Sequence, residues 1–111
     1  MNINQRDLVL LPYPFSNLKE RKVRPAIVVS NNNFNKICSD CVAVPLTSVI
    51  KEEPFSILIN QGDMGNGKLI RPSRVRVDKI FSVEKRLVQM KIGNVNDNFF
   101  DKLKSELIEV F

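Results

Sequence analysis

Histidine is absent from this chain of 111 residues, and cysteine occurs only twice. Without histidine, the chain cannot build the Ser-His or Cys-His pairs that most hydrolases use. Zinc takes about four ligands, usually Cys and His, so Cys38 and Cys41 alone are too few. We therefore expect no metal and no cofactor, and chemistry that depends on arginine, hydroxyl and carboxylate groups.

Two other motifs are present only in part. Cys38 and Cys41 have the C-x2-C spacing of redox-active dithiols, but the strand-turn-helix setting of such dithiols is missing around them. We interpret them as two ordinary reduced thiols and keep the redox pair as the alternative. The stretch QGDMGNGK, residues 61–68, differs in spacing from the phosphate-binding loop G-x-x-x-x-G-K-[ST], so that loop is excluded.

The chain also lacks any long apolar run. None approaches the roughly 18 residues that span a membrane, and Met1–Arg6 has no apolar signal-peptide core. We therefore expect a cytoplasmic protein with no membrane partner. Hydrophobic residues make up 43% of the chain and charged residues 26%, as in globular proteins, so we predict a single domain over residues 1–111.

Positive charge exceeds negative charge, and the net charge is +5. The excess is uneven, because residues 61–95 contain eight Lys and Arg against three Asp and Glu, whereas residues 96–111 contain two against four. A basic surface attracts polyanions, so RNA or DNA is the partner class that this charge favours. A solvated Lys and Arg face is the alternative interpretation, and the placement of the arginines has to separate the two.

Short apolar segments bounded by proline, glycine and asparagine predict strands. The first is Asp7–Leu11, which ends at Pro12 and precedes a loop that extends to residue 23. The other predicted strands are 24–30, 41–47, 55–60, 72–80 and 87–92. Pro45 interrupts the third strand, where we expect a bulge or bend. Residues 61–68 hold three of the four glycines and are predicted as a turn or mobile loop.

Helical periodicity occurs near the C-terminal end. Asn96 or Asn98 is the predicted N-cap. The apolar positions with helical spacing are Phe100, Leu103, Leu107, Val110 and Phe111. Several short strands followed by one amphipathic helix indicate a mainly β fold with some α, in which a small, strongly bent antiparallel barrel packs against the helix.

The candidate functional residues stand near the ends of predicted strands. Arg24 joins a basic loop to the second strand, and Thr47 and Ser48 follow the third. Arg76 and Asp78 lie on the charged face of the strand over residues 72–80. A guanidinium and a hydroxyl together suit a phosphate and the extra negative charge of its transition state. Strand ends of a small barrel can converge, so these places can share one groove.

Each of these residues also has a purely structural interpretation. Arg24 alone fits a solvated loop cation, and Thr47 fits a hydroxyl that bonds its own backbone at a strand end. Asp78 fits a surface partner of Arg76 or Lys79, which would stabilise the fold by less than about 1 kcal/mol. The occurrence of all three together favours the functional interpretation.

Several short motifs make the sequence similar to a known family. They are DLVLLPYPF at the start, VRPAIVVS after the basic loop, VPLTS after the third strand, and then RVDKI and SVEK. In this order and spacing, over essentially the whole chain, they resemble the MazF/PemK (Kid) family of type II toxins. The resemblance implies a homodimer with an SH3-like antiparallel β-barrel of the CcdB/MazF type and a C-terminal amphipathic helix.

The resemblance also implies an activity. Members of that family are sequence-specific endoribonucleases that cut single-stranded RNA without metal, which inhibits translation and growth, and a cognate antitoxin protein covers the RNA groove. For this chain it implies cleavage by the 2′-hydroxyl of the RNA, which leaves a 2′,3′-cyclic phosphate or 3′-phosphate and a 5′-hydroxyl. DNA lacks the 2′-hydroxyl and should resist cutting even where it binds.

The resemblance implies four catalytic residues. Arg24 matches the family's catalytic arginine and Thr47 its catalytic threonine, and Arg76 with Asp78 matches an R-x-D pair of the PemK/Kid branch. Some members of that branch have a histidine before the R-P motif, where this chain has Asn17 nearby. Our hypothesis is that Arg24 binds the scissile phosphate and Thr47 hydrogen-bonds a phosphate oxygen. Asp78 would accept the 2′-hydroxyl proton, as a weak base with an ordinary pKa of about 4.

RNA sequence is usually read on unstacked bases by aromatic and arginine planes and by nearby hydrogen-bonding groups. Phe15 fits a core anchor better than a base contact. The predicted RNA-binding residues are Tyr13, Asn17, Lys19, Arg21, Lys22, Ser48 and Arg74.

Two alternatives belong to other functional classes. A barrel of the same fold could bind RNA or DNA without cutting it, since a fold alone does not decide function. A toxin of the structurally related CcdB type poisons gyrase through protein contacts near its C-terminal helix. The acidic helix and the missing C-terminal aromatic pattern of this chain disfavour the second alternative.

Overall fold

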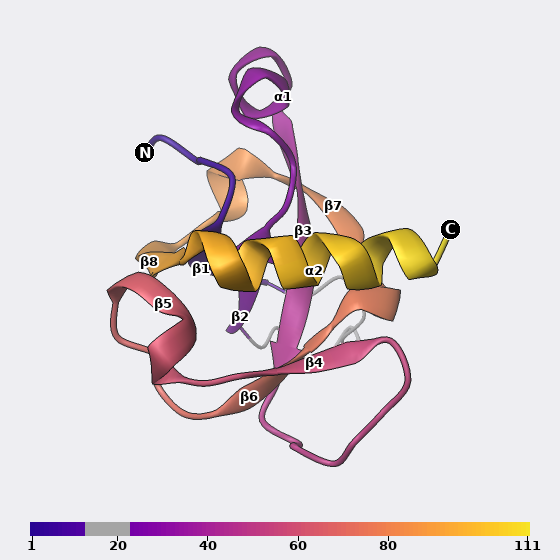
Figure 1. Cartoon of the computed structure of the whole chain (residues 1–111). Coiled ribbons are helices and arrows are strands. Elements are labelled where there is room, and N and C mark those ends of the chain that lie inside the picture. Colours follow the sequence, from indigo (N-terminus) through magenta and orange to yellow (C-terminus); the bar gives the residue numbers. More distant parts are fainter. Residues whose placement is uncertain (13–22) are drawn as a thin grey trace.

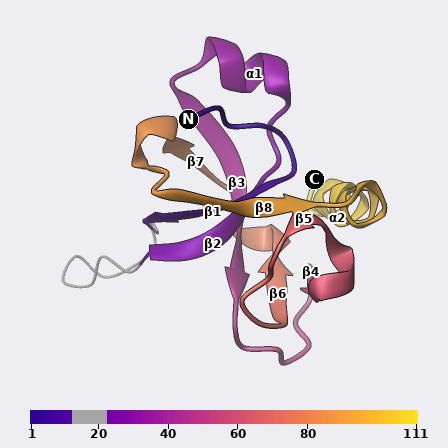
Figure 2. The ribbon, with the colours of Figure 1, turned by 90° about the vertical axis from the view of Figure 1, so that its left-hand side faces the viewer.

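The structure is a computed structural model that describes residues 1–12 and 23–111. Its elements are β1 (Asp7–Pro12), β2 (Val23–Val28), α1 (Asn32–Ile37), β3 (Asp40–Thr47), β4 (Ser56–Ile59), β5 (Met64–Gly67), β6 (Ser73–Arg76), β7 (Phe81–Glu84), β8 (Met90–Val95) and α2 (Asp97–Glu109). Within the described residues the strands form one curled sheet in the order β4-β6-β3-β2-β1-β8-β5, and β7 pairs with β3 beside this path. All pairs are antiparallel, and Figures 1 and 2 show the half-barrel shape. The predicted mainly β fold with a C-terminal helix is confirmed.

Strand β3 is central because it pairs with three other strands. Residues 40–43 pair with β7, residues 46–47 pair with β6, and residues 43–45 pair with β2 on the other side. The register with β2 runs to Ala26↔Pro45 without a shift, so the predicted bulge at Pro45 is not found there. Pro45 lies between the β7 and β6 ladders, where no described pair needs the N–H that proline lacks.

Two hydrophobic cores lie on opposite faces of the sheet, because successive strand residues point to opposite sides. On β1, β2 and β3 the first core takes Leu8, Ile27, Val44 and Leu46. The second core takes from the same strands Val9, Leu11, Ala26, Val28, Cys41 and Ala43. The first core is covered by α2, which crosses the sheet in Figure 1 and is seen end-on in Figure 2.

Helix α2 begins at the predicted cap. The side chain of Asn96 accepts a hydrogen bond from the backbone N–H of Phe99 at 2.8 Å. Its buried residues are Phe99, Phe100 and Leu103. Burying an apolar side chain of this size stabilises the fold by about 1.5–3 kcal/mol. The predicted apolar face is wrong at its end, because the helix stops at Glu109 and leaves Val110 and Phe111 38% and 87% exposed.

The stretch over residues 61–67 is more regular than the predicted loop. After a short 3-10 turn, it forms β5 and pairs with β8. Two glycines allow this pairing, since Gly67 has a φ of +86° and a Cβ at Gly93 would lie 2.1 Å from the carbonyl oxygen of Asn66. Strand β8 therefore runs past Gly93, where the sequence predicted its end, to Val95.

Two more elements differ from the prediction. The strand predicted over residues 72–80 divides into β6, a 3-10 turn and β7, so that β6 and β7 follow each other along β3. The turn begins at Val77, whose N–H donates to the carbonyl oxygen of Phe55 at 3.0 Å. Helix α1 was missed, although Asn31 caps it by accepting from the N–H of Phe34 at 2.8 Å. No helix in the described parts of the chain is long and apolar enough to cross a membrane.

Candidate functional site

Arg24 and Thr47 extend the same face of the sheet from neighbouring strands. The pairing of β2 with β3 ends at Ala26↔Pro45, and the register continued by two residues brings Arg24 level with Thr47. Ala26 belongs to the second core, so Arg24, two residues before it, points to the same face. Both side chains are half-buried. A cation and a hydroxyl therefore stand at the polar end of the face that carries the second core.

Arg74 joins this group from β6, where it is the direct pairing partner of Thr47. Its Nε donates to the Oγ of Ser56 at 2.9 Å, and its Nη2 donates to the carbonyl oxygen of Ser56 at 3.0 Å. The hydroxyl of Thr47 accepts the backbone N–H of Val49 at 3.2 Å, which is the local bond of the structural interpretation. This bond leaves the hydroxyl hydrogen for another acceptor, and Arg74 keeps further N–H groups.

Arg76 and Asp78 form a two-pronged ion pair on the same side of β6 as Arg74. The Nε of Arg76 donates to Oδ1 of Asp78 at 3.0 Å, and Nη2 donates to Oδ2 at 2.8 Å. The side chains are 30% and 32% exposed. The hydrogen bonds from Arg76 lower the pKa of Asp78 below its ordinary value, although partial burial acts in the opposite direction. Asp78 therefore stays ionised near neutral pH and is a weak base.

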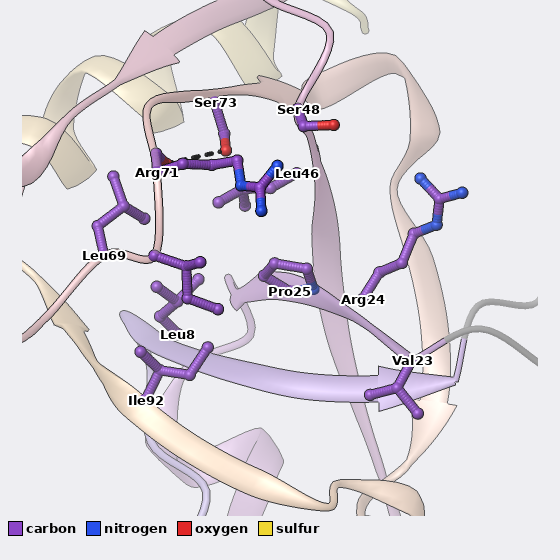
Figure 3. A pocket seen from close by; sticks show the side chains of 11 residues that line it. Leu8, Val23, Arg24, Pro25, Leu46, Ser48, Leu69, Arg71, Ser73 and Ile92 are labelled. Atoms are coloured by element: carbon purple, nitrogen blue, oxygen red, sulfur yellow. Dashed lines mark hydrogen bonds between the residues drawn. The ribbon is translucent and has the colours of Figure 1, made fainter.

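A cavity of about 330 Å³ opens where β3 leaves β2 (Figure 3). Its lining residues are Leu8, Val23, Arg24, Pro25, Leu46, Ser48, Leu69, Ile70, Arg71, Ser73 and Ile92. In Figure 3, Arg24 and Ser48 stand on one side, and Leu8, Leu69 and Ile92 stand on the other. Thr47 does not line this cavity, because it points to the opposite face from its neighbours Leu46 and Ser48. Arg24 thus borders both the cavity and the face of Thr47.

Arg71 is a cation of this site that the sequence analysis missed. Figure 3 shows its guanidinium reaching toward the middle of the cavity. Its backbone carbonyl accepts a hydrogen bond from the hydroxyl of Ser73 at 3.1 Å, which links it to the start of β6. One signal was available, since Arg71 precedes Pro72 just as Arg24 precedes Pro25.

The remaining predicted residues divide into two sets. Ser48 is exposed and lines the cavity, and Arg74 is anchored to β4 as described above. The other predicted RNA-binding residues lie outside the described part of the chain, namely Tyr13, Asn17, Lys19, Arg21 and Lys22. The roles of all these residues stay predictions.

The two cysteines are free thiols on and beside β3. Burial raises the pKa of the Cys41 thiol, and the neighbouring charge of Asp40 raises it further. A thiol of this kind is unreactive, because the thiolate is the nucleophile. Within residues 1–12 and 23–111, no three His, Cys, Asp or Glu side chains gather as a metal site.

A sequence model of one family matches residues 4–111, and that family is described as "PemK-like, MazF-like toxin of type II toxin-antitoxin system". No curated protein matches the chain. The fold is similar to that of MazE-MazF (Form-III) from Deinococcus radiodurans, with a TM-score of 0.80 and 20% identity over 99% of this chain and 96% of that chain.

Two mycobacterial structures are also similar. One is an endoribonuclease in complex with its cognate antitoxin from Mycobacterial species, with a TM-score of 0.79 and 20% identity over 97% of this chain and 93% of that chain. The other is Mycobacterium tuberculosis toxin MazF-mt6, with a TM-score of 0.76 and 16% identity over 96% of each chain. At these identities the structures support the fold, whereas the family follows from the match over residues 4–111.

Proposed function

The chain belongs to the family of PemK-like, MazF-like toxins of type II toxin-antitoxin systems, and on this basis we propose that it is a metal-independent endoribonuclease. Its substrate is single-stranded RNA, and cutting mRNA in the cytoplasm inhibits translation and growth. One observation carries the proposal: Arg24 and Thr47 extend the same face of the sheet from adjacent strands. A guanidinium and a hydroxyl so placed are suited to hold one phosphate.

In the proposed reaction, the RNA supplies its own nucleophile. The 2′-oxygen forms a bond to the adjacent phosphorus, and the bond from phosphorus to the 5′-oxygen breaks. Negative charge builds up on the non-bridging oxygens in between. Arg24 donates N–H bonds to these oxygens, and Thr47 donates the hydroxyl hydrogen that its bond with Val49 leaves available. The products are a 2′,3′-cyclic phosphate, or a 3′-phosphate after hydrolysis, and a 5′-hydroxyl.

Two protons move in this reaction. The 2′-hydroxyl proton passes to Asp78, which Arg76 keeps ionised and holds in place through both carboxylate oxygens. Since the same hydrogen bonds lower the pKa of Asp78, its contribution as a base is small. The departing 5′-oxygen takes its proton from water, because a guanidinium holds its proton too tightly to act as an acid. Charge stabilisation by Arg24 and Thr47 therefore supplies most of the rate.

Two protein partners complete the proposal. The chain forms a homodimer, and a cognate antitoxin protein covers the RNA groove, as the assignment to a type II toxin-antitoxin family implies. An acidic antitoxin suits the net charge of +5.

The proposal is tested with end-labelled single-stranded RNA, purified protein and EDTA. We expect cutting at discrete sites, with cyclic phosphate or 3′-phosphate and 5′-hydroxyl ends, and no cutting of DNA with the same sequence. The Arg24→Ala variant, purified in the same way, controls for contaminating ribonuclease. Binding of RNA without cutting would overturn the proposal in favour of a non-catalytic nucleic-acid-binding barrel, and inhibition of gyrase in a supercoiling assay would favour a CcdB-like toxin.

A further inference from the structure

We propose that the cavity bordered by β2, β3, β8 and residues 69–71 binds one nucleobase of the RNA, and that Arg71 binds the phosphate attached to that nucleoside. This inference rests on the proposed ribonuclease function and adds a second substrate subsite to it. It also makes Arg71 a substrate-binding residue, which neither the motifs nor the family match identifies.

The size and lining of the cavity suit a largely apolar ring. The buried residues of the lining are Leu8, Leu46, Leu69 and Ser73. The volume of about 330 Å³ lies at the low end of the roughly 300–1,000 Å³ of small-molecule sites, so the cavity has room for one nucleoside. Ser48 and Ser73 add hydroxyl groups that can bond the edge of a base.

The charges around the cavity select an anionic ligand. Of the described residues that line it, two are arginines and none carries a carboxylate. Arg71 is exposed and forms no ion pair or side-chain hydrogen bond with any described residue, whereas Arg74 is bonded to Ser56 and Arg76 to Asp78. Its N–H groups are therefore available to a phosphate, and the guanidinium plane can stack on a base.

Arg24 connects this cavity to the proposed cleavage site. It lines the cavity and also extends the face that carries Thr47. Because Thr47 points to the other face of the sheet, an RNA chain bound at both places would pass around the Arg24 end of β2. A protein segment with acidic and apolar side chains is the rival ligand. RNA is favoured because the cavity shares Arg24 with the proposed phosphate site.

Binding is tested by NMR on the full chain with labelled methyl groups. The probes are 2′-deoxyadenosine and 2′-deoxyuridine 3′,5′-bisphosphates, which cannot be cut by 2′-hydroxyl attack. We expect chemical-shift changes centred on the methyl groups of Leu46, Leu69 and Ile92, with Kd about 10-fold higher in Arg71→Ala and unchanged in Arg86→Ala. Shift changes of the same size and affinity with inorganic phosphate alone would overturn the base subsite. Unchanged methyl signals with both nucleotides would do so as well.

Cleavage of a random RNA pool provides the second test. Ile92→Phe narrows the cavity from β8, and we expect it to change the base preference at one position beside the cut. Arg71→Ala should raise KM about 10-fold and leave kcat within about 2-fold, because the residue binds substrate but does not touch the reacting atoms. Thermal unfolding of each variant confirms that it is folded.

The two proposals can fail separately. If the wild-type chain cuts RNA and both variants keep the same cut sites and the same KM, the subsite is wrong and the ribonuclease stands. If the chain cuts no RNA but the bisphosphates shift the cavity methyl groups, the ribonuclease is wrong and the nucleotide site stands.

Discussion

Positively charged side chains lie in different surroundings at the two ends of strand β3. At the Asp40 end, Arg86 is paired with Glu84, and Lys85 donates to the backbone carbonyl of Asn35. At the Thr47 end, Arg24 and Arg71 border a cavity that has no carboxylate among its described lining residues. At the first end Arg86 is paired with a carboxylate, whereas at the second end Arg71 has no carboxylate partner among the described residues. The position of an arginine relative to the carboxylates therefore indicates a binding site better than the net charge of +5 does.

Substitution of an arginine at each end gives the largest expected contrast. We expect Arg24→Ala to reduce RNA cleavage by about 100- to 1,000-fold, the effect of losing one main group that stabilises transition-state charge. Arg86→Ala should leave the rate within about 2-fold, because its side chain is 76% exposed and paired locally at the far end of β3. Single-turnover cleavage of one labelled RNA measures both rates.

Thermal unfolding separates catalysis from folding in this pair of variants. Both should keep a midpoint within about 4 °C of the wild type, since surface and half-buried polar substitutions change stability little. An equal loss of activity and stability in Arg24→Ala would contradict this prediction, because Arg24 would then be a structural residue.

Substitution of Thr47, at the same end of β3, should reduce RNA cleavage less than Arg24→Ala does. Thr47→Val removes the hydroxyl and keeps the shape, and we expect cleavage to fall by about 10- to 100-fold, as for a lost hydrogen bond to a charged group. Thr47→Ser keeps the hydroxyl and is the matched control, with a rate within about 3-fold of the wild type. The rates come from the same single-turnover assay. If Ser and Val at this position were equally inactive, the methyl group rather than the hydroxyl would be the important part.

The smallest effect concerns the Arg76–Asp78 pair and depends on pH. The pKa of Asp78 is lowered in the folded chain, so the pair stabilises the fold above the unfolded pKa of about 4 and this stability is lost as pH falls below it. Urea unfolding of the wild type and of Asp78→Asn should differ by about 1 kcal/mol or less at pH 7. The difference should shrink toward zero between about pH 5 and pH 2. A difference that persists at the lowest pH would assign the effect to packing.

Local signals explain which parts of the fold could be predicted from the sequence. The start of α2 was predictable because an N-cap at Asn96 and helical spacing coincide within a few residues. The division of residues 72–80 was not, because Val77 is buried and continues the alternation of a strand even though the backbone turns there. Strand β5 was missed because a glycine-rich stretch is typical of a loop. It forms a strand only because β8 lies beside it and approaches closely at Gly93.

Some parts of the candidate site could also be predicted from the sequence, and others could not. Arg24 and Thr47 could be named from short motifs, and the register of β2 with β3 brings them to one face. The cavity could not be predicted, because its lining comes from β1, β2, β3, β6, β8 and residues 69–71, which only the folded chain brings together. Arg71 precedes a proline, as Arg24 does, but this dipeptide alone predicts no function. Only the structure shows that both arginines line the same cavity.

Pro45 marks the point where β3 exchanges one set of neighbours for another, and this has a mechanical consequence. The register of β2 with β3 ends at Ala26↔Pro45, so Arg24 and Thr47 stand two residues beyond the paired part of the two strands. A protein segment that enters at this end would spread Arg24 and Thr47, the two residues proposed to hold the phosphate, while the paired residues from Ala26 to Val28 keep their partners on β3. Inactivation of this kind needs no unfolding and reverses as soon as the segment is withdrawn.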